Sequence, residues 1–155
     1  SLDGHMFAPR PSFVVKELAR VLKPGGVLAF STWPKELFMG KFFKLIESFS
    51  RPLPPEVASP VLWGDMAVIE DRLRDHFDHI EFARDTMFAP TMSPAHMLKL
   101  FEKNAGPLAN LVKALADDPA KLSNLRNAAL VLIEKFFSNN FLRQDFLMTR
   151  CVKKT

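Results

Sequence analysis

The feature that most constrains the fold is a Pro-Gly-Gly reversal at residues 24–26, placed between two very different patterns. Before it, from Ser12, apolar residues such as Val14 and Leu18 recur at helical spacing and share one face. After it, residues 27–32 (Val-Leu-Ala-Phe-Ser-Thr) show no polar alternation, which suits a strand covered on both faces, as in a parallel sheet. Proline and paired glycines end the helix. The sequence therefore predicts an α/β fold.

The rest of the chain predicts few strands and many helices. Three strands make a thin sheet, and the first is too apolar for an edge, because an exposed apolar edge invites pairing. We therefore expect part of the sheet to lie outside this chain, and the chain to form a homo-oligomer through the exposed strand edge. The expected elements are helices near 38–49, 66–76, 94–105, 107–116 and 119–137, strands over 79–89 and 141–152, and a turn at Asn139-Asn140.

Composition bounds the class of protein. A chain of 155 residues that is 48% hydrophobic has the size and apolar content of one packed domain, so we expect residues 1–155 to form a single domain. No apolar run is long enough to span a bilayer, and Cys151 is the single cysteine. We therefore expect no membrane partner and a reducing, cytoplasmic location. The net charge of +4 is spread along the chain, so no nucleic-acid partner is expected.

Three stretches resemble the class I S-adenosylmethionine-dependent methyltransferases. Residues 17–28 (Glu-Leu-Ala-Arg-Val-Leu-Lys-Pro-Gly-Gly-Val-Leu) look like the late motif of that family, where a helix and a Pro-Gly-Gly turn precede the fifth strand. Residues 1–9, with Met6-Phe7-Ala8-Pro9, resemble the segment after the fourth strand in the type 11, UbiE-like subgroup. Residues 59–64 (Ser-Pro-Val-Leu-Trp-Gly) also look like that subgroup.

The resemblance implies a partial Rossmann-like methyltransferase sheet made of the C-terminal strands, the last ones antiparallel. A helical substrate-cap insertion would occupy about residues 93–138, between the last two strands. The family's Gly-x-Gly-x-Gly turn and acidic ribose-binding residue are not found in this sequence. The chain therefore resembles the C-terminal portion of such an enzyme, beginning just past the fourth strand. The resemblance implies that the full-length enzyme uses S-adenosylmethionine as its cofactor. We expect this chain alone not to bind the cofactor tightly and to be inactive.

Candidate site residues follow from the rule that ligands bind outside the carboxyl ends of strands in open α/β sheets. By resemblance, the segment that would line the cofactor contains Ser1, Gly4, Met6 and Phe7. The acceptor pocket would be walled by Trp33, Phe38 and Trp63, and the alternative is that these aromatic residues only pack a loop. His5 is the one titratable residue placed to act as a general base, with Asp3 to orient it. The alternative is an ordinary loop histidine or a tag remnant.

Two further readings stay open. The expected function is methyl transfer from S-adenosylmethionine to a small-molecule or lipid-like acceptor, and the alternative is a non-catalytic, truncated relic that associates with itself or a partner. No metal site is expected: the spacing Asp75-His76-Phe77-Asp78-His79 is metal-like but falls at a predicted helix end, where histidine favours the dipole. Cys151 lies on an apolar strand and is expected to be a buried, inert thiol.

Overall fold

The structure is a computed structural model that describes all residues, 1–155. It confirms an α/β fold, with six α-helices and a sheet whose strand order is β1-β4-β2. The chain forms two compact units. The sheet unit comprises Ser1–Lys35, Leu53–Asp85 and Asp145–Thr155, and the helical unit comprises Glu36–Pro52 and Thr86–Gln144. Strands β2 (Phe77–Pro90) and β4 (Phe141–Lys153) contribute residues to both units.

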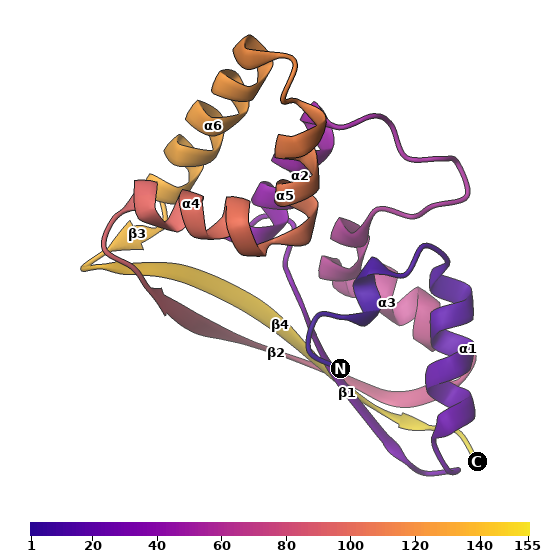
Figure 1. Cartoon of the computed structure of the whole chain (residues 1–155). Helices are drawn as coiled ribbons and strands as arrows, with labels where there is room; N and C mark the ends of the chain where they lie inside the picture. The colour runs from indigo at the N-terminus through magenta and orange to yellow at the C-terminus, as the bar shows by residue number, and fades with distance from the viewer. The chain divides into compact units, whose positions relative to one another are not determined.

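The sheet unit combines strand β1 with two helices and two short 3-10 helices. Helices α1 and α3 contact each other and lie side by side in Figure 1. Val15 and Ala19 are the buried residues of α1, and Ile69 and Leu73 those of α3. The bounds are η1 His5–Phe7, α1 Pro11–Val21, β1 Val27–Thr32, η2 Pro60–Gly64 and α3 Met66–Leu73.

The Pro-Gly-Gly turn is fastened to the last strand of the chain. Gly25 has φ 72°, a left-handed conformation that glycine adopts without steric cost. Its N–H donates to the carbonyl of Lys153 at 3.0 Å, and the N–H of Lys153 donates to the carbonyl of Gly26 at 2.8 Å. The Lys153 ammonium also donates to the carbonyl of Leu22, beyond the end of α1, at 2.7 Å. The turn therefore ends α1, starts β1 and holds the end of β4.

Strand β1 pairs antiparallel with β4, from Val27 opposite Val152 to Thr32 opposite Leu147. The expectation that β1 is covered on both faces was wrong for its first half: Val27 is 50% exposed and Ala29 is exposed, whereas burial is continuous from Phe30. β1 stands at one end of the strand order, and its one parallel partner is the isolated bridge between Leu2 and Ser31. Helical packing on both faces is therefore not what stabilises the start of this strand.

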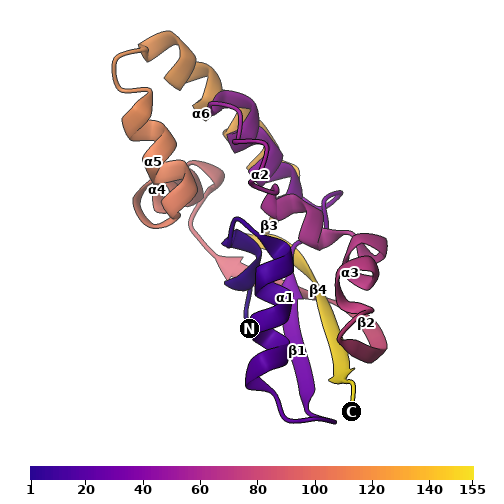
Figure 2. The ribbon, with the colours of Figure 1, turned by 90° about the vertical axis from the view of Figure 1, so that its right-hand side faces the viewer.

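The helical unit contains four helices that pack on one another. Helix α6 contacts α2 and α4, and α5 contacts α4 and α2; α2 and α6 can be followed side by side in Figure 2. Two helix starts are capped as the Ser-Pro and Asp-Pro pairs indicate, since Ser93 Oγ accepts from the N–H of His96 and Asp118 Oδ1 accepts from the N–H of Lys121. The bounds are α2 Phe38–Phe49, α4 Pro94–Asn104, α5 Gly106–Ala114 and α6 Pro119–Glu134.

A tight hairpin follows α6. The helix ends at Glu134 rather than at residue 137, because Phe137–Ser138 form the short strand β3, which pairs with β4. Asn139 and Asn140 make the turn, with φ of 50° and 61°, as a type I′ hairpin requires.

The helical stretch expected at 93–138 holds α4, α5 and α6, and the grouping of the whole chain as one domain stays a prediction. No helix has both the length and the apolar composition needed to cross a membrane.

Candidate functional site

Three separate segments of the sheet unit meet at an aromatic cluster. The His5 ring of η1 lies 4.7 Å from the Trp63 ring of η2 and 4.4 Å from the Phe30 ring of β1, measured between centroids. Phe30 and Trp63 are 5.8 Å apart and perpendicular. His5 is 9% exposed and the other two side chains are 1% exposed. The structure therefore brings two of the predicted site residues, His5 and Trp63, into direct contact.

The His5 imidazole is oriented on one side and unpartnered on the other. Its Nδ1 lies 3.3 Å from Ser1 Oγ, whereas its Nε2 is buried without a hydrogen-bond partner. Burial, with smaller contributions from the amino-terminal charge and Arg72, lowers the pKa of His5 from 6.5 to about 4. The ring is therefore neutral at pH 7. A general base works best when its pKa lies near the working pH. The lowered pKa of His5 therefore favours a role as a hydrogen-bonding group over a role as a general base.

Trp63 is held in place by its neighbour and by the end of β1. A Cβ added at Gly64 would lie 1.9 Å from the carbonyl oxygen of Trp33, so that only glycine permits this approach. Trp33 is 7% exposed and Trp63 is 1% exposed. The indole Nε1 of Trp63 is buried and has no hydrogen-bond partner. The two tryptophans expected in the acceptor pocket thus belong to adjoining backbone segments, and their pocket role stays a prediction.

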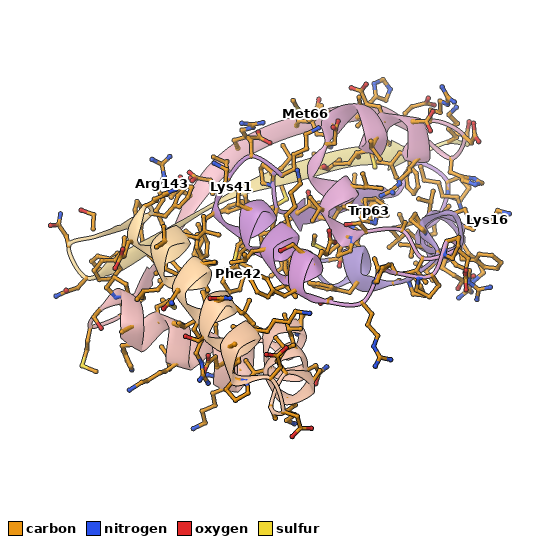
Figure 3. All side chains as sticks on the ribbon, turned by 90° about the horizontal axis from the view of Figure 1, so that it is seen from above. Lys16, Lys41, Phe42, Trp63, Met66 and Arg143 are labelled. Atoms are coloured by element: carbon orange, nitrogen blue, oxygen red, sulfur yellow. The ribbon has the colours of Figure 1, made fainter.

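Arg72 of α3 joins this cluster, and sequence reasoning missed it. Its guanidinium lies 4.5 Å above the centroid of the Trp63 ring, a cation–π arrangement. Its Nη1 is buried without a hydrogen-bond partner, and burial lowers the pKa of the guanidinium. An arginine in a short amphipathic helix normally indicates a solvated face, so no local signal distinguishes Arg72. Figure 3 labels Trp63, the ring on which Arg72 stacks.

The amino-terminal segment reaches the carboxyl half of β1. The Ser1 amino group donates to the carbonyl of Ala29, and the N–H of Ser31 donates to the carbonyl of Ser1, each at 3.0 Å. Asp3 has φ 57°, and its carboxylate accepts from the Ser31 hydroxyl at 2.8 Å. Asp3 is therefore bonded to Ser31, and it is Ser1 that contacts the His5 ring.

The expected cofactor-lining residues do not form a cradle by themselves. Gly4 precedes η1 as its N-cap residue, and Met6 is 1% exposed and belongs to the core. Phe7 is 48% exposed. The amino and carbonyl groups of Ser1 are bonded to β1, so neither Ser1 nor the buried Met6 leaves a free group to contact a cofactor. The residues present therefore do not fit S-adenosylmethionine on their own, and their cofactor-binding roles stay predictions.

Phe38, the third residue expected in the acceptor pocket, lies in the core of the helical unit. It is completely buried and packs on three phenylalanine rings, with centroid distances of 5.6, 6.1 and 5.5 Å to Phe42, Phe101 and Phe136. Lys41 lies 5.7 Å from the centroid of the Phe136 ring. This environment is that of a packed core residue, and a role in a pocket stays a prediction.

Other candidate groups give no site. Cys151 is buried and unpaired, as predicted, and burial raises its pKa to about 11, which keeps the thiol protonated. The structure gathers no group of three His, Cys, Asp or Glu residues that could hold a metal ion.

A groove of about 470 Å³ runs along α1 and is lined by Arg10, Phe13, Leu18 and Val21 among others.

Comparison with known proteins gives distant relatives of unassigned function. The chain is 28% identical over 149 residues to the uncharacterized protein Rv1403c of Mycobacterium tuberculosis H37Rv, covering 96% of this chain and 54% of the relative. It is 24% identical over 155 residues to the uncharacterized protein Rv1405c of the same strain, covering 99% of this chain and 57% of the relative. The chain thus spans about half the length of the curated relatives it matches.

A crystal structure from Bacillus halodurans C-125, of a protein provisionally named a methyltransferase, is similar over 99% of this chain and 62% of that one. The TM-score is 0.48 and the sequence identity 13%, so this likeness carries no functional conclusion. No family model matches the chain.

Proposed function

We propose that this chain is the C-terminal portion of an S-adenosylmethionine-dependent methyltransferase that acts on a small-molecule or lipid-like acceptor. One observation supports this most: two of the stretches that carry the sequence resemblance, residues 1–9 and 59–64, meet in the sheet unit, beside the strand that the third stretch leads into. η1 contacts η2 through His5 and Trp63, and the segment before η1 is bonded to β1. The meeting point is beside the carboxyl half of β1, where ligands of open α/β sheets bind.

The residues present support positioning of the acceptor more than proton transfer. S-adenosylmethionine supplies an electrophilic methyl group when it is bound. Holding the acceptor atom in line for such a displacement supplies much of the rate on its own. The neutral His5 ring, oriented by Ser1 and with a free Nε2, is suited to hydrogen-bond an acceptor hydroxyl. Trp33 and Trp63 would contribute apolar surface beside it.

We propose that the groups that hold the cofactor lie mainly outside these 155 residues. The support is that the Gly-x-Gly-x-Gly turn is absent from the sequence and that Ser1, Gly4, Met6 and Phe7 form no cradle. The chain alone is then inactive and binds the cofactor weakly. A cytoplasmic location belongs to the same proposal.

The deciding experiment begins with the coding sequence immediately upstream of the native codons for this chain. We expect an in-frame extension in which a strand is followed by Gly-x-Gly-x-Gly. Isothermal titration calorimetry with S-adenosylhomocysteine then compares the extended protein with the 155-residue chain as its control. Saturable binding by the extended protein alone supports the proposal. A start codon just before Met6 with a stop codon upstream, or an extended protein that does not bind, overturns it.

A second candidate function, a non-catalytic relic that associates with itself, is favoured by the open start of the β1 edge, before the residues that the amino-terminal segment covers. β1 ends the strand order, Val27 is 50% exposed, and Val21 of the neighbouring α1 is 65% exposed. Sedimentation velocity over a range of concentrations tests this. Val27→Lys should weaken self-association by at least about tenfold, because a lysine blocks edge pairing. Val131→Lys, at a 52% exposed position of α6, is the matched control. A chain that stays monomeric at high concentration excludes this function.

A further inference from the structure

We propose that Arg72, His5 and Trp63 form a binding site for an oxyanion, the carboxylate or phosphate group of a small molecule. The site is argued from these three side chains and their contacts within the sheet unit. It rests on the proposed function in one respect only, since that function would make the oxyanion part of the methyl acceptor.

The first argument is the unsatisfied hydrogen-bonding capacity of the cluster. Nε2 of His5, Nε1 of Trp63 and Nη1 of Arg72 are each buried without a partner. Buried polar atoms in folded proteins nearly always have one. The indole and guanidinium nitrogens can only donate a hydrogen bond. Therefore what the indole and the guanidinium lack is a hydrogen-bond acceptor, and the proposal is that one oxygen-rich group supplies it to both.

The second argument is charge. Arg72 makes no direct ion pair: the carboxylate of Asp71, the charge that acts on Arg72 from nearby, pairs with Arg74 at 2.6 Å. Its contact is instead the face of Trp63, at 4.5 Å from the ring centroid. A partly buried guanidinium that no carboxylate contacts directly is costly, since the solvation lost on burial is only partly replaced. The planar fork of N–H groups matches the two oxygens of a carboxylate or phosphate. An oxyanion would supply the missing charge.

The third argument concerns His5, which can become a third donor. A Ser1 hydroxyl that donates to Nδ1 leaves the proton of the neutral ring on Nε2, so that Nε2 donates. The nearest carboxylate in the sequence, Asp3, accepts from the Ser31 hydroxyl. Arg72 as a whole is of intermediate exposure, although its Nη1 is buried, so part of this side chain reaches the solvent.

The test is a titration of the 155-residue chain followed by ¹H–¹⁵N NMR at the indole N–H of Trp63. Sodium phosphate and sodium acetate are added separately, with sodium chloride at equal ionic strength as the reference. We expect a saturable shift of the Trp63 resonance, assigned by its loss in Trp63→Phe. A shift with phosphate alone assigns a phosphate group, one with acetate alone a carboxylate, and both support a general oxyanion site. Absence of a shift, or an equal shift with chloride, overturns the proposal.

Variants of arginine give the second readout. Arg72→Gln should weaken binding by at least about tenfold, because charge and fork are both lost. Arg20→Gln, at an exposed arginine of α1 paired to Glu17, is the matched control and should bind as the parent does. If Arg72→Gln does not fold, Arg72→Lys keeps the charge, loses the fork and should still bind more weakly. Equal affinity in a folded Arg72 variant overturns the proposal. Neither readout needs methyl transfer, so failure of the proposed function would leave these results standing.

Discussion

The imidazole of His5 stands perpendicular to the indole of Trp63, with the ring planes at 86° and the centroids 4.7 Å apart. Such an edge-to-face pair contributes about 0.5–1.5 kcal/mol beyond the burial of its surface. It joins the amino-terminal η1 to the loop helix η2, and Arg72 covers the same indole. A substitution of any one of these three side chains should therefore alter the packing of the other two.

The stability of the chain should fall as the pH decreases from 6.5 to 4. The folded state holds the pKa of His5 at about 4, below the ordinary value of 6.5. In that range the unfolded chain therefore takes up a proton that the folded chain does not, and below pH 4 the loss levels off. We expect His5 to contribute a decrease on the order of 2–3 kcal/mol. Urea unfolding from pH 4 to 7.5 measures it, and His5→Gln should flatten the dependence. An unchanged slope in that variant would refute the assignment.

Gly64→Ala should destabilise the chain strongly. The new Cβ would lie 1.9 Å from the Trp33 carbonyl oxygen, so backbone must move at the end of β1. We expect a loss of about 3 kcal/mol. Gly106→Ala is the matched control, because nothing lies within 4 Å of the added Cβ and alanine favours the helix. Chemical denaturation of both variants checks the pair, and similar stabilities would contradict the close approach.

Phe38→Ala tests whether this residue is core or pocket wall. Phe38 is fully buried against three phenylalanine rings, so its removal should cost about 3–5 kcal/mol by leaving a cavity. The control is Phe88→Ala, at a 59% exposed position of the same unit, which should cost much less. Thermal unfolding distinguishes the two. A near-neutral Phe38→Ala would support the pocket role instead.

The hairpin at Asn139-Asn140 should respond to turn chemistry. Both residues have positive φ, where asparagine is tolerated and β-branched residues are not. Asn140→Gly is expected to stabilise by about 0.5 kcal/mol, because Asn-Gly is the preferred type I′ pair, and Asn140→Val to destabilise by about 1 kcal/mol or more. Equilibrium unfolding of the two variants gives the order. The reverse order would show that the turn is not left-handed.

Most elements of the fold could be predicted because their boundaries are marked locally. Ser93-Pro94 and Asp118-Pro119 begin helices by satisfying free N–H groups, and residues 24–26 end one. The apolar run at 27–32 was correctly assigned to a strand. The expected burial of both faces of this strand was wrong at its start, where Val27 is exposed. The exposure of Val27 depends on which elements pack beside β1, and hydrophobic periodicity gives no information about that.

The candidate site was predictable only in part. The resemblance placed His5 and Trp63 in the same site, because each lies in a stretch that is similar to one family. It did not predict that the two rings are in contact. Arg72 could not be found, since an arginine on a short helix shows the same local pattern whether it faces water or an indole. The partner of His5 was also missed: Asp3 is bonded to Ser31 because its left-handed backbone and the parallel bridge of Leu2 direct it there.

The pairing of β1 with β4 has a consequence for synthesis of the chain on the ribosome. Residues 27–32 find their antiparallel partners only at residues 147–152, so this pairing cannot form until those distant residues have been translated. All four helices of the helical unit end by Glu134 and emerge earlier. During that interval the apolar face of β1 has no strand beside it. β1 is therefore one of the apolar segments that a nascent-chain chaperone would meet unpaired during that interval.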